Sequence, residues 1–212
     1  MSFLLDKCTL KLLDEKVLSE SKEFKCKNTD KKSTRDLNEF FKKDCCAFTS
    51  QLLGKTYCFT LDSDPSTIIC AFTLSNESIK ANDLPNSRKR KLTKYIPNQK
   101  HFKSYPAVLI GRLGVSVDYG RNGIGSELMT FIKSWFRDPL NKTGCRFIAV
   151  DSYNIEEVKE YYLKNGLWFL FSSEEQERDY LGLPNILEDG SKPEPLKTRL
   201  MVYDLIHLNP GI

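Results

Sequence analysis

Histidine is scarce in this chain of 212 residues, which contains only His101 and His207. The seven cysteines are odd in number and include no C-x-x-C pair. Zinc sites and disulfide frameworks are built from such residues, so both are disfavoured, and we expect no metal and a reducing, cytoplasmic location. A histidine on the last predicted strand, His207, is expected to be structural. The net charge of +4 is too small to identify a partner class.

Long apolar runs are also lacking. The N-terminal stretch "MSFLLDKCTLKLLDEK" carries charges at Asp6, Lys7 and Lys11, and nothing reaches the length of a signal peptide or a membrane span. We therefore expect a soluble protein that is not exported and has no membrane partner. A hydrophobic content of 40% and an aromatic content of 11% are enough for a sizeable core and exclude a disordered chain.

The periodicity of apolar residues predicts one α/β domain over residues 1–212, because helices alternate with strands in the second half. The expected elements, in order, are a short strand and turn (3–19), a helix (34–48), a hairpin (55–74), a polar connection (76–105), a long strand (107–117), a glycine turn with its helix, a strand (145–152), a helix (154–166), a strand (167–171), an acidic surface insertion (172–197) and a final strand (198–208).

Three glycines, Gly120, Gly123 and Gly125, fall between the long strand and the following helix. Glycine lets backbone N–H groups approach a ligand closely, and a helix N-terminus carries about half a positive charge, so the pattern suits a phosphate group. A tight turn without a ligand fits the glycines equally well. A P-loop is excluded because no lysine precedes Ser126, and the spacing G-x-x-G-x-G is the reverse of a dinucleotide-binding turn.

The stretch "GRNGIGSEL", after a strand reading "GRLGV", resembles the acetyl-CoA motif of the GNAT acetyltransferases. Gly123 and Gly125 match the family glycines. Gly120 replaces the usual Gln or Arg, and Arg121 is the candidate for the missing donor. The resemblance implies a mixed central sheet with helices on both faces and a strand that pairs with the pantetheine arm. The implied cofactor residues are Leu113, Gly114, Val115, Gly120, Arg121, Asn122, Gly123, Ile124, Gly125 and Ser126.

A second stretch, "VKEYYLKNGLWFL", resembles the family pattern A-x-x-F-Y-x-x-x-G-F. The family tyrosine falls on Tyr162, four residues before Gly166, and the resemblance implies that it protonates the leaving CoA thiolate. A core tyrosine on an amphipathic helix is the alternative. Asn154 is expected to cap this helix together with Glu157, and a cofactor contact by Asn154 is the alternative.

The resemblance extends over roughly residues 24 to 171. The segment around Cys26 and the stretch "SYPAVLIGRLGV" are similar to a GNAT subgroup that includes toxins of toxin–antitoxin pairs, which acetylate aminoacyl-tRNA. The Cys26 segment departs from that subgroup, because it lacks a glycine and carries a short insertion. A tRNA acceptor and a small antitoxin are the partners that this subgroup implies.

Charge bears on the acceptor. The stretch Asn86–Lys103 contains no acidic residue, and Tyr95 and Phe102 are interleaved with its basic residues, so it could contact phosphates and stack on bases. A solvated loop is the alternative. The insertion 172–197 either covers the acceptor groove or lies on the surface. The basic residues are Arg88, Lys89, Arg90, Lys91, Lys94, Lys100 and Lys103.

These observations predict an enzyme that transfers an acetyl group from acetyl-CoA to a primary amine by direct attack, with Tyr162 as the proton donor. Glu77, placed past the end of the hairpin strand, is the candidate base. The alternatives are a tRNA-acetylating toxin and a catalytically silent acyl-CoA-binding module. We expect a homodimer, because the final strand 198–208 would otherwise be an exposed edge. The sequence leaves the acceptor and the organism open.

Overall fold

The computed structural model of the chain describes residues 2–26, 32–96 and 102–206. These residues form two compact units. The first comprises Met1–Asn76 and Leu109–Pro139, and the second comprises Glu77–Val108 and Leu140–Ile212. Strands β3 (Asp64–Lys80) and β4 (Ser104–Val115) contribute residues to both units. The single domain expected from the sequence stays a prediction.

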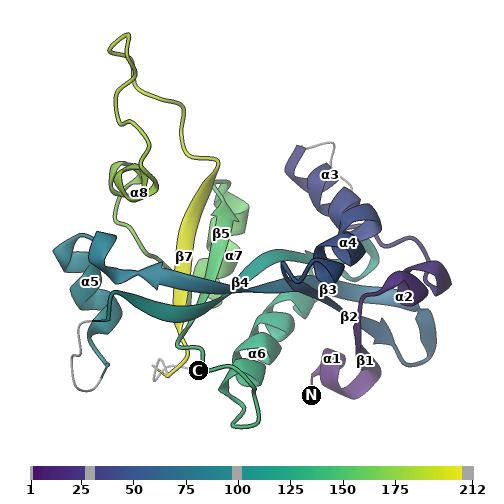
Figure 1. Cartoon of the computed structure of the whole chain (residues 1–212). Helices are drawn as coiled ribbons and strands as arrows, with labels where there is room; N and C mark the ends of the chain where they lie inside the picture. Colours follow the sequence, from purple (N-terminus) through teal and green to yellow (C-terminus); the bar gives the residue numbers. More distant parts are fainter. Residues whose placement is uncertain (1, 27–31, 97–101, 207–212) are drawn as a thin grey trace. The chain divides into compact units, whose positions relative to one another are not determined.

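Each unit contains both helices and strands (Figure 1). Besides β3 and β4, the first unit contains α1 (Phe3–Lys7), β1 (Cys8–Leu12), α2 (Glu15–Glu20), α3 (Lys32–Glu39), a π-helical turn (Phe40–Asp44), α4 (Cys45–Ser50), β2 (Lys55–Leu61) and α6 (Ile124–Arg137). The second contains α5 (Asn86–Thr93), β5 (Phe147–Tyr153), α7 (Glu156–Lys164), β6 (Trp168–Phe169), α8 (Glu174–Leu181) and β7 (Thr198–Asp204).

The described strands neighbour one another in the order β1-β2-β3-β4-β5-β7-β6. β2 pairs antiparallel with β1 and β3 in the first unit, and β7 pairs antiparallel with β5 and β6 in the second. The sheet as a whole is mixed. The α/β class predicted from the sequence is therefore confirmed.

In the first unit, helices cover both faces of the sheet because the side chains of β2 alternate between them. Tyr57 and Phe59 point to one face, where their rings lie 5.0 Å from those of Trp135 and Phe131 on α6. Cys58 points to the other face, into a buried cluster formed with residues of the π-helical turn and α4. The predicted helices on both faces are thus present in this unit.

The N-terminal prediction was wrong in part. Residues 3–19 were expected to form a strand and a turn, whereas α1 and α2 flank the strand β1. Both helices are capped, since Ser2 Oγ accepts from Leu5 N at 3.3 Å and Asp14 Oδ1 accepts from Val17 N at 2.8 Å. Helices of five and six residues are too short to show a helical period in the sequence.

The polar connection predicted for residues 76–105 was also wrong. β3 continues to Lys80, and helix α5 begins after Pro85, whose carbonyl accepts from Arg88 N and Lys89 N at 2.9 Å each. Proline suits the start of a helix because its fixed φ matches the first turn and its missing N–H is not needed there. The long strand β4 ends at Val115 rather than Val117, since a 3₁₀ turn begins at Val117.

The final strand is not an edge strand. β7 lies between β5 and β6, with Trp168 opposite Val202 and Phe169 opposite Met201. The exposed edge that motivated the expectation of a homodimer is therefore absent along this part of β7. The homodimer stays a prediction, and an exposed edge on this part of β7 no longer supports it.

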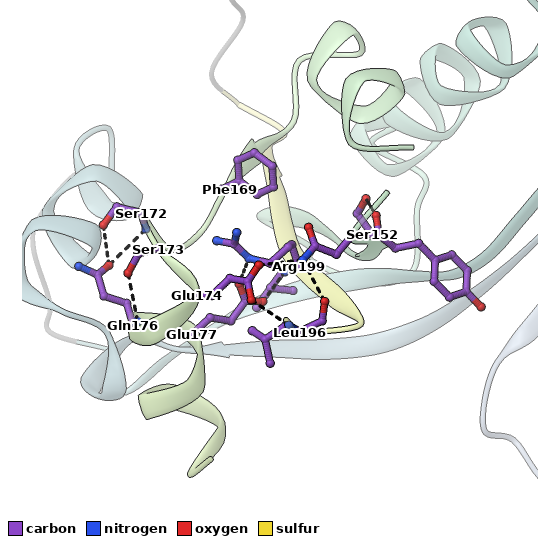
Figure 2. Close-up of polar contacts among 12 residues, drawn as sticks. Ser152, Phe169, Ser172, Ser173, Glu174, Gln176, Glu177, Leu196 and Arg199 are labelled. Atoms are coloured by element: carbon purple, nitrogen blue, oxygen red, sulfur yellow. Dashed lines mark hydrogen bonds and ion pairs between the residues drawn. The ribbon is translucent and has the colours of Figure 1, made fainter. Parts of the chain in front are cut away.

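The insertion 172–197 is not a simple surface loop. Its helix α8 buries the side chain of Glu177, whose carboxylate accepts from Arg199 Nε at 2.6 Å and from Leu200 N at 2.5 Å (Figure 2). Glu174 accepts from Leu196 N at 2.8 Å. Burial raises the pKa of Glu177, and the Arg199 guanidinium opposes that rise. The two glutamates therefore connect α8 to the start of β7. The segment between α8 and β7 extends as a long loop (Figure 1).

Two absences concern the described residues only. No helix among them is long and apolar enough to cross a membrane. Within the same ranges, no three side chains of His, Cys, Asp or Glu are grouped so that they could hold a metal ion.

The end of β4 is packed tightly in the first unit. A Cβ added to Gly114 would collide with Cys26 Sγ and would lie 3.2 Å from Phe41 Cε2. Cys26 is buried, and its segment is held in place because Cys26 N donates to Asn38 Oδ1 at 2.8 Å. Gly114 is therefore required by close packing, independently of any ligand.

We predict that Gly114→Ala lowers the free energy of unfolding by about 1–3 kcal/mol, because the new methyl group overpacks the contact with Cys26. Combining it with Cys26→Ala should recover part of the loss. Gly111→Ala is the matched control on the same strand, since a Cβ there meets nothing within 4 Å among the described residues. Urea denaturation of the four proteins measures the effect, and an equal loss for Gly111→Ala would contradict it.

Candidate functional site

The predicted glycine turn connects β4 to α6 in the first unit. After β4, a 3₁₀ turn covers Val117–Tyr119, and Gly120 N donates to Val117 O at 3.4 Å. Arg121 then has a φ of 64° and Gly123 a φ of 81°, so both enter the left-handed region. A non-glycine residue such as Arg121 seldom adopts this conformation. Arg121 therefore carries backbone strain in the turn that the sequence singled out, as Leu52 does elsewhere with a φ of 57°.

Gly123 is the N-cap residue of α6. No side chain of the described residues caps this helix, and a Cβ added to Gly123 would meet nothing within 4 Å among them. The glycine is thus required by its backbone conformation and not by crowding from the protein. A helix N-terminus with open space over its first residue and no capping side chain can accept an anion.

The cofactor residues predicted on β4 lie on the strand segment just before this turn. Ser116 N donates to Ile69 O of β3 at 2.8 Å, whereas Val117 N donates to Lys25 O at 2.8 Å. Because successive N–H groups of a strand point to opposite sides, those of Leu113 and Val115 face away from β3. This is the orientation needed to pair with an added extended chain. Gly114 has the packing role described above.

Tyr162 lies on α7 in the second unit and is buried, with 9% of its surface exposed. Burial raises the pKa of its phenol well above the usual value. Its ring lies 5.0 Å from that of Tyr161. Gly166 follows with a φ of 78° and marks the end of the helix, as the sequence predicted. A phenol in this state stays protonated at neutral pH and so holds the proton that it would donate.

Asn154 does not cap α7, and this prediction was wrong. The N-cap is Ile155, without a side-chain hydrogen bond from the described residues. The amide nitrogen of Asn154 instead donates to Glu174 Oε1 at 2.8 Å and to Leu196 O at 2.9 Å. Asn154 is therefore part of the network that anchors α8, and the structure gives it no contact that favours the cofactor alternative.

Glu77 lies inside β3 rather than past the end of the hairpin strand. Its side chain is exposed, and Oε1 accepts from Ser78 N at 2.7 Å. Its role as the base stays a prediction.

The basic stretch is divided between two environments. Lys91 Nζ lies 4.1 Å from the centroid of the Trp168 ring, and Arg88 Nη2 donates to Phe169 O at 3.3 Å. Burial lowers the pKa of both groups. Arg90 is exposed, and Lys89 Nζ donates to Asn82 Oδ1 at 3.3 Å. Arg88 and Lys91 thus attach α5 to β6. Lys100 and His207 lie outside the described residues.

Arg112 is a candidate binding residue that the predictions from the sequence missed. It lies on β4 between Gly111 and Leu113, and its guanidinium carbon lies 5.1 Å from the centroid of the Phe40 ring. The signal was present in the sequence, since a charged residue interrupts the apolar run "AVLIGRLGV".

The mixed sheet, with the strand–glycine turn–helix unit β4–α6, is the GNAT fold that the sequence predicts. Solved structures with this fold were found by comparison. No protein-family model matches the sequence, and no curated protein matches it.

Three of these structures are a variant of KacT and two complexes of AtaT. A tyrosine-to-phenylalanine variant of KacT is 16% identical, with a TM-score of 0.57, covering 94% of this chain and 96% of its own. AtaT complexed with acetyl-methionyl-tRNAfMet is 17% identical, with a TM-score of 0.56, covering 78% and 89%. An AtaT toxin variant bound to the C-terminus of the antitoxin AtaR and to acetyl-CoA is 13% identical, with a TM-score of 0.51, covering 94% of both chains. At identities this low, the likeness establishes the fold alone.

Proposed function

We propose that this chain is an acetyl-CoA-dependent N-acetyltransferase that acts on the primary amine of an aminoacyl-tRNA. The observation that carries the proposal is the left-handed, uncapped turn at Gly123, placed between β4 and α6 of a GNAT fold. The likeness to AtaT, which was solved with acetyl-CoA and with an acetylated aminoacyl-tRNA, supports both the cofactor and the acceptor.

The cofactor would bind with its diphosphate at the N-terminus of α6. The turn between Gly120 and Ser126 would supply backbone N–H groups there, whereas Gly120 N and Ser126 N themselves donate to Val117 O and Gly123 O. Leu113 and Val115 would offer their N–H groups to the pantetheine arm. The thioester carbonyl would be polarised by backbone donors of the same strand.

We predict that Gly123→Asn weakens acetyl-CoA binding at least about tenfold, because the new side chain occupies the space that the diphosphate needs. Asparagine tolerates the left-handed conformation, so the fold should survive. Calorimetric titration with acetyl-CoA measures the change. Gly190→Asn is the matched control, since Gly190 also has a φ of 81° and open space around it. Unchanged affinity in folded Gly123→Asn would contradict the cofactor site.

Tyr162 is proposed as the proton donor to the CoA thiolate. A phenol is neutral at pH 7 even at its ordinary pKa, which is the state that this role requires, and burial raises the pKa of Tyr162 further. The acceptor amine must arrive uncharged, and Glu77 is the candidate for the group that removes its proton.

We predict that Tyr162→Phe folds normally, binds acetyl-CoA and loses roughly 100- to 10,000-fold in kcat, the range typical of a general acid. Tyr161→Phe is the matched variant on the same helix and should keep its turnover. Steady-state rates with acetyl-CoA and a complete set of charged tRNAs provide the measurement. Loss of activity in Tyr161→Phe alone would show that the motif is out of register by one residue.

The same assay tests the acceptor. Transfer to the amino group of a charged tRNA supports the proposal, whereas transfer only to other amines leaves a general amine acetyltransferase. Cofactor binding without any transfer leaves the silent acyl-CoA-binding module. An antitoxin partner is proposed only by the likeness to AtaT bound to AtaR.

Helix α5 is proposed as part of the tRNA contact. We predict that Lys89→Ala with Arg90→Ala reduces the salt slope of tRNA binding by about two, because each phosphate contact contributes about one. Arg88→Ala with Lys91→Ala should instead lower the Tm, because it removes the contacts with Phe169 and Trp168. Binding isotherms at several salt concentrations and thermal melts separate the two pairs, and an unchanged slope for the first pair would exclude α5.

A further inference from the structure

Arg112 lies on β4 of the first unit, beside Phe40 of the π-helical turn and Asp36 of α3. Arg112 is two residues before Gly114. Its side chain therefore points to the face of β4 on which Gly114 lies against Cys26 and Phe41. The guanidinium of Arg112 lies over the buried ring of Phe40, and 38% of the side chain is exposed. The group is thus packed against an aromatic ring and remains accessible from solvent.

The hydrogen bonds of Arg112 are incomplete. A guanidinium has five N–H donors. Nη1 donates to Gly111 O at 2.8 Å, but Nη2 is 3.7 Å from Asp36 Oδ2, which is too long for a direct hydrogen bond. Nε is buried and has no acceptor in the part of the chain that the structure describes. Such an orphaned donor costs free energy in the absence of a partner.

A structural role alone explains these contacts poorly. Arg88 and Arg146 also have a buried Nε without an acceptor among the described residues, so the orphaned Nε does not by itself distinguish Arg112. Arg146 is nevertheless held in a structural ion pair, since its Nη2 lies 2.7 Å from Asp204 Oδ2 with both side chains 12% exposed. Arg112 has no such bond, and an apolar side chain would cover Phe40 without leaving a donor unpaired. The loose pair with Asp36 can open when a stronger acceptor arrives. The guanidinium fork matches a phosphate or a carboxylate, which accept two parallel hydrogen bonds.

We propose that Arg112 is a phosphate-binding residue that takes a phosphodiester group of the nucleic-acid acceptor, with Phe40 setting the plane of the guanidinium and Asp36 as the partner that it exchanges. This inference rests on the proposed function. It is favoured by position, since Arg112 directly precedes Leu113, the first residue proposed to pair with the cofactor arm. A phosphate bound here lies beside the cofactor segment, where an aminoacylated RNA end must arrive to react. The cofactor's own phosphates are the other source of the same chemistry.

The test compares Arg112→Gln and Arg112→Lys with the wild type, and uses Arg137→Gln as the control, because Arg137 is an exposed arginine at the end of α6. Binding of uncharged tRNA is measured at several salt concentrations, and acetyl-CoA binding is measured by calorimetry. Transfer is measured to charged tRNA and to a phosphate-free aminoacyl ester.

We expect Arg112→Gln to weaken tRNA binding at least about tenfold and to reduce its salt slope by about one. Acetyl-CoA affinity and the KM for the phosphate-free ester should stay unchanged, as should all values for Arg137→Gln. Arg112→Lys should keep the salt slope but weaken binding, because lysine keeps the charge and loses the fork.

Unchanged tRNA affinity in Arg112→Gln, or no tRNA binding by the wild type, overturns the proposal. Equal weakening of acetyl-CoA binding assigns the residue to the cofactor instead, and equal loss with the phosphate-free ester indicates a structural role. If Arg112→Gln fails to fold, Arg112→Lys decides, since full tRNA affinity in that variant would exclude a bidentate phosphate contact. If the wild type binds tRNA with the expected dependence on Arg112 but acetylates no charged tRNA, the proposed function fails and this site stands.

Discussion

The short hydrogen bonds at the end of β4 are the constraint on which the site depends. Ser116 N bonds to β3 and Val117 N bonds to Lys25 O, so the chain is held from both sides at the point where it leaves the sheet. The left-handed residues Arg121 and Gly123 follow within seven residues, and the conformation of Arg121 is one that a non-glycine residue adopts only when its surroundings hold it. Without this anchor, the N-terminus of α6 would have no defined position relative to the strand beside it.

The glycine turn, the helix after it and the alternation of the hairpin strands could be predicted because each is set by local chemistry. Gly123 needs a positive φ, and the period of two in β2 needs two covered faces. The turn was recognisable even though Gly120 departs from the family pattern, since that residue has an ordinary extended conformation with a φ of −61°.

The failures concern elements that depend on contacts distant in the sequence. The sequence pattern predicts that Asn154 caps a helix. Its amide nitrogen instead donates to Glu174 and to the carbonyl of Leu196, which both lie in the insertion. The insertion reads as a surface loop because seven acidic residues dominate its composition. Its helix is nevertheless anchored, because the carboxylate of Glu177 meets Arg199 across 22 residues of sequence. A sequence pattern shows that a residue is charged, but it does not show whether that residue has a buried partner in the fold.

The two tryptophans of the chain fall one in each unit. Trp135 lies in the aromatic cluster of α6, 5.0 Å from the ring of Tyr57, whereas Trp168 lies beneath the ammonium group of Lys91 on α5. Indole emission is sensitive to its surroundings, so the protein carries two separate optical probes without any added label. One reports on the helix that begins at the glycine turn, and the other reports on the attachment of the basic helix to β6.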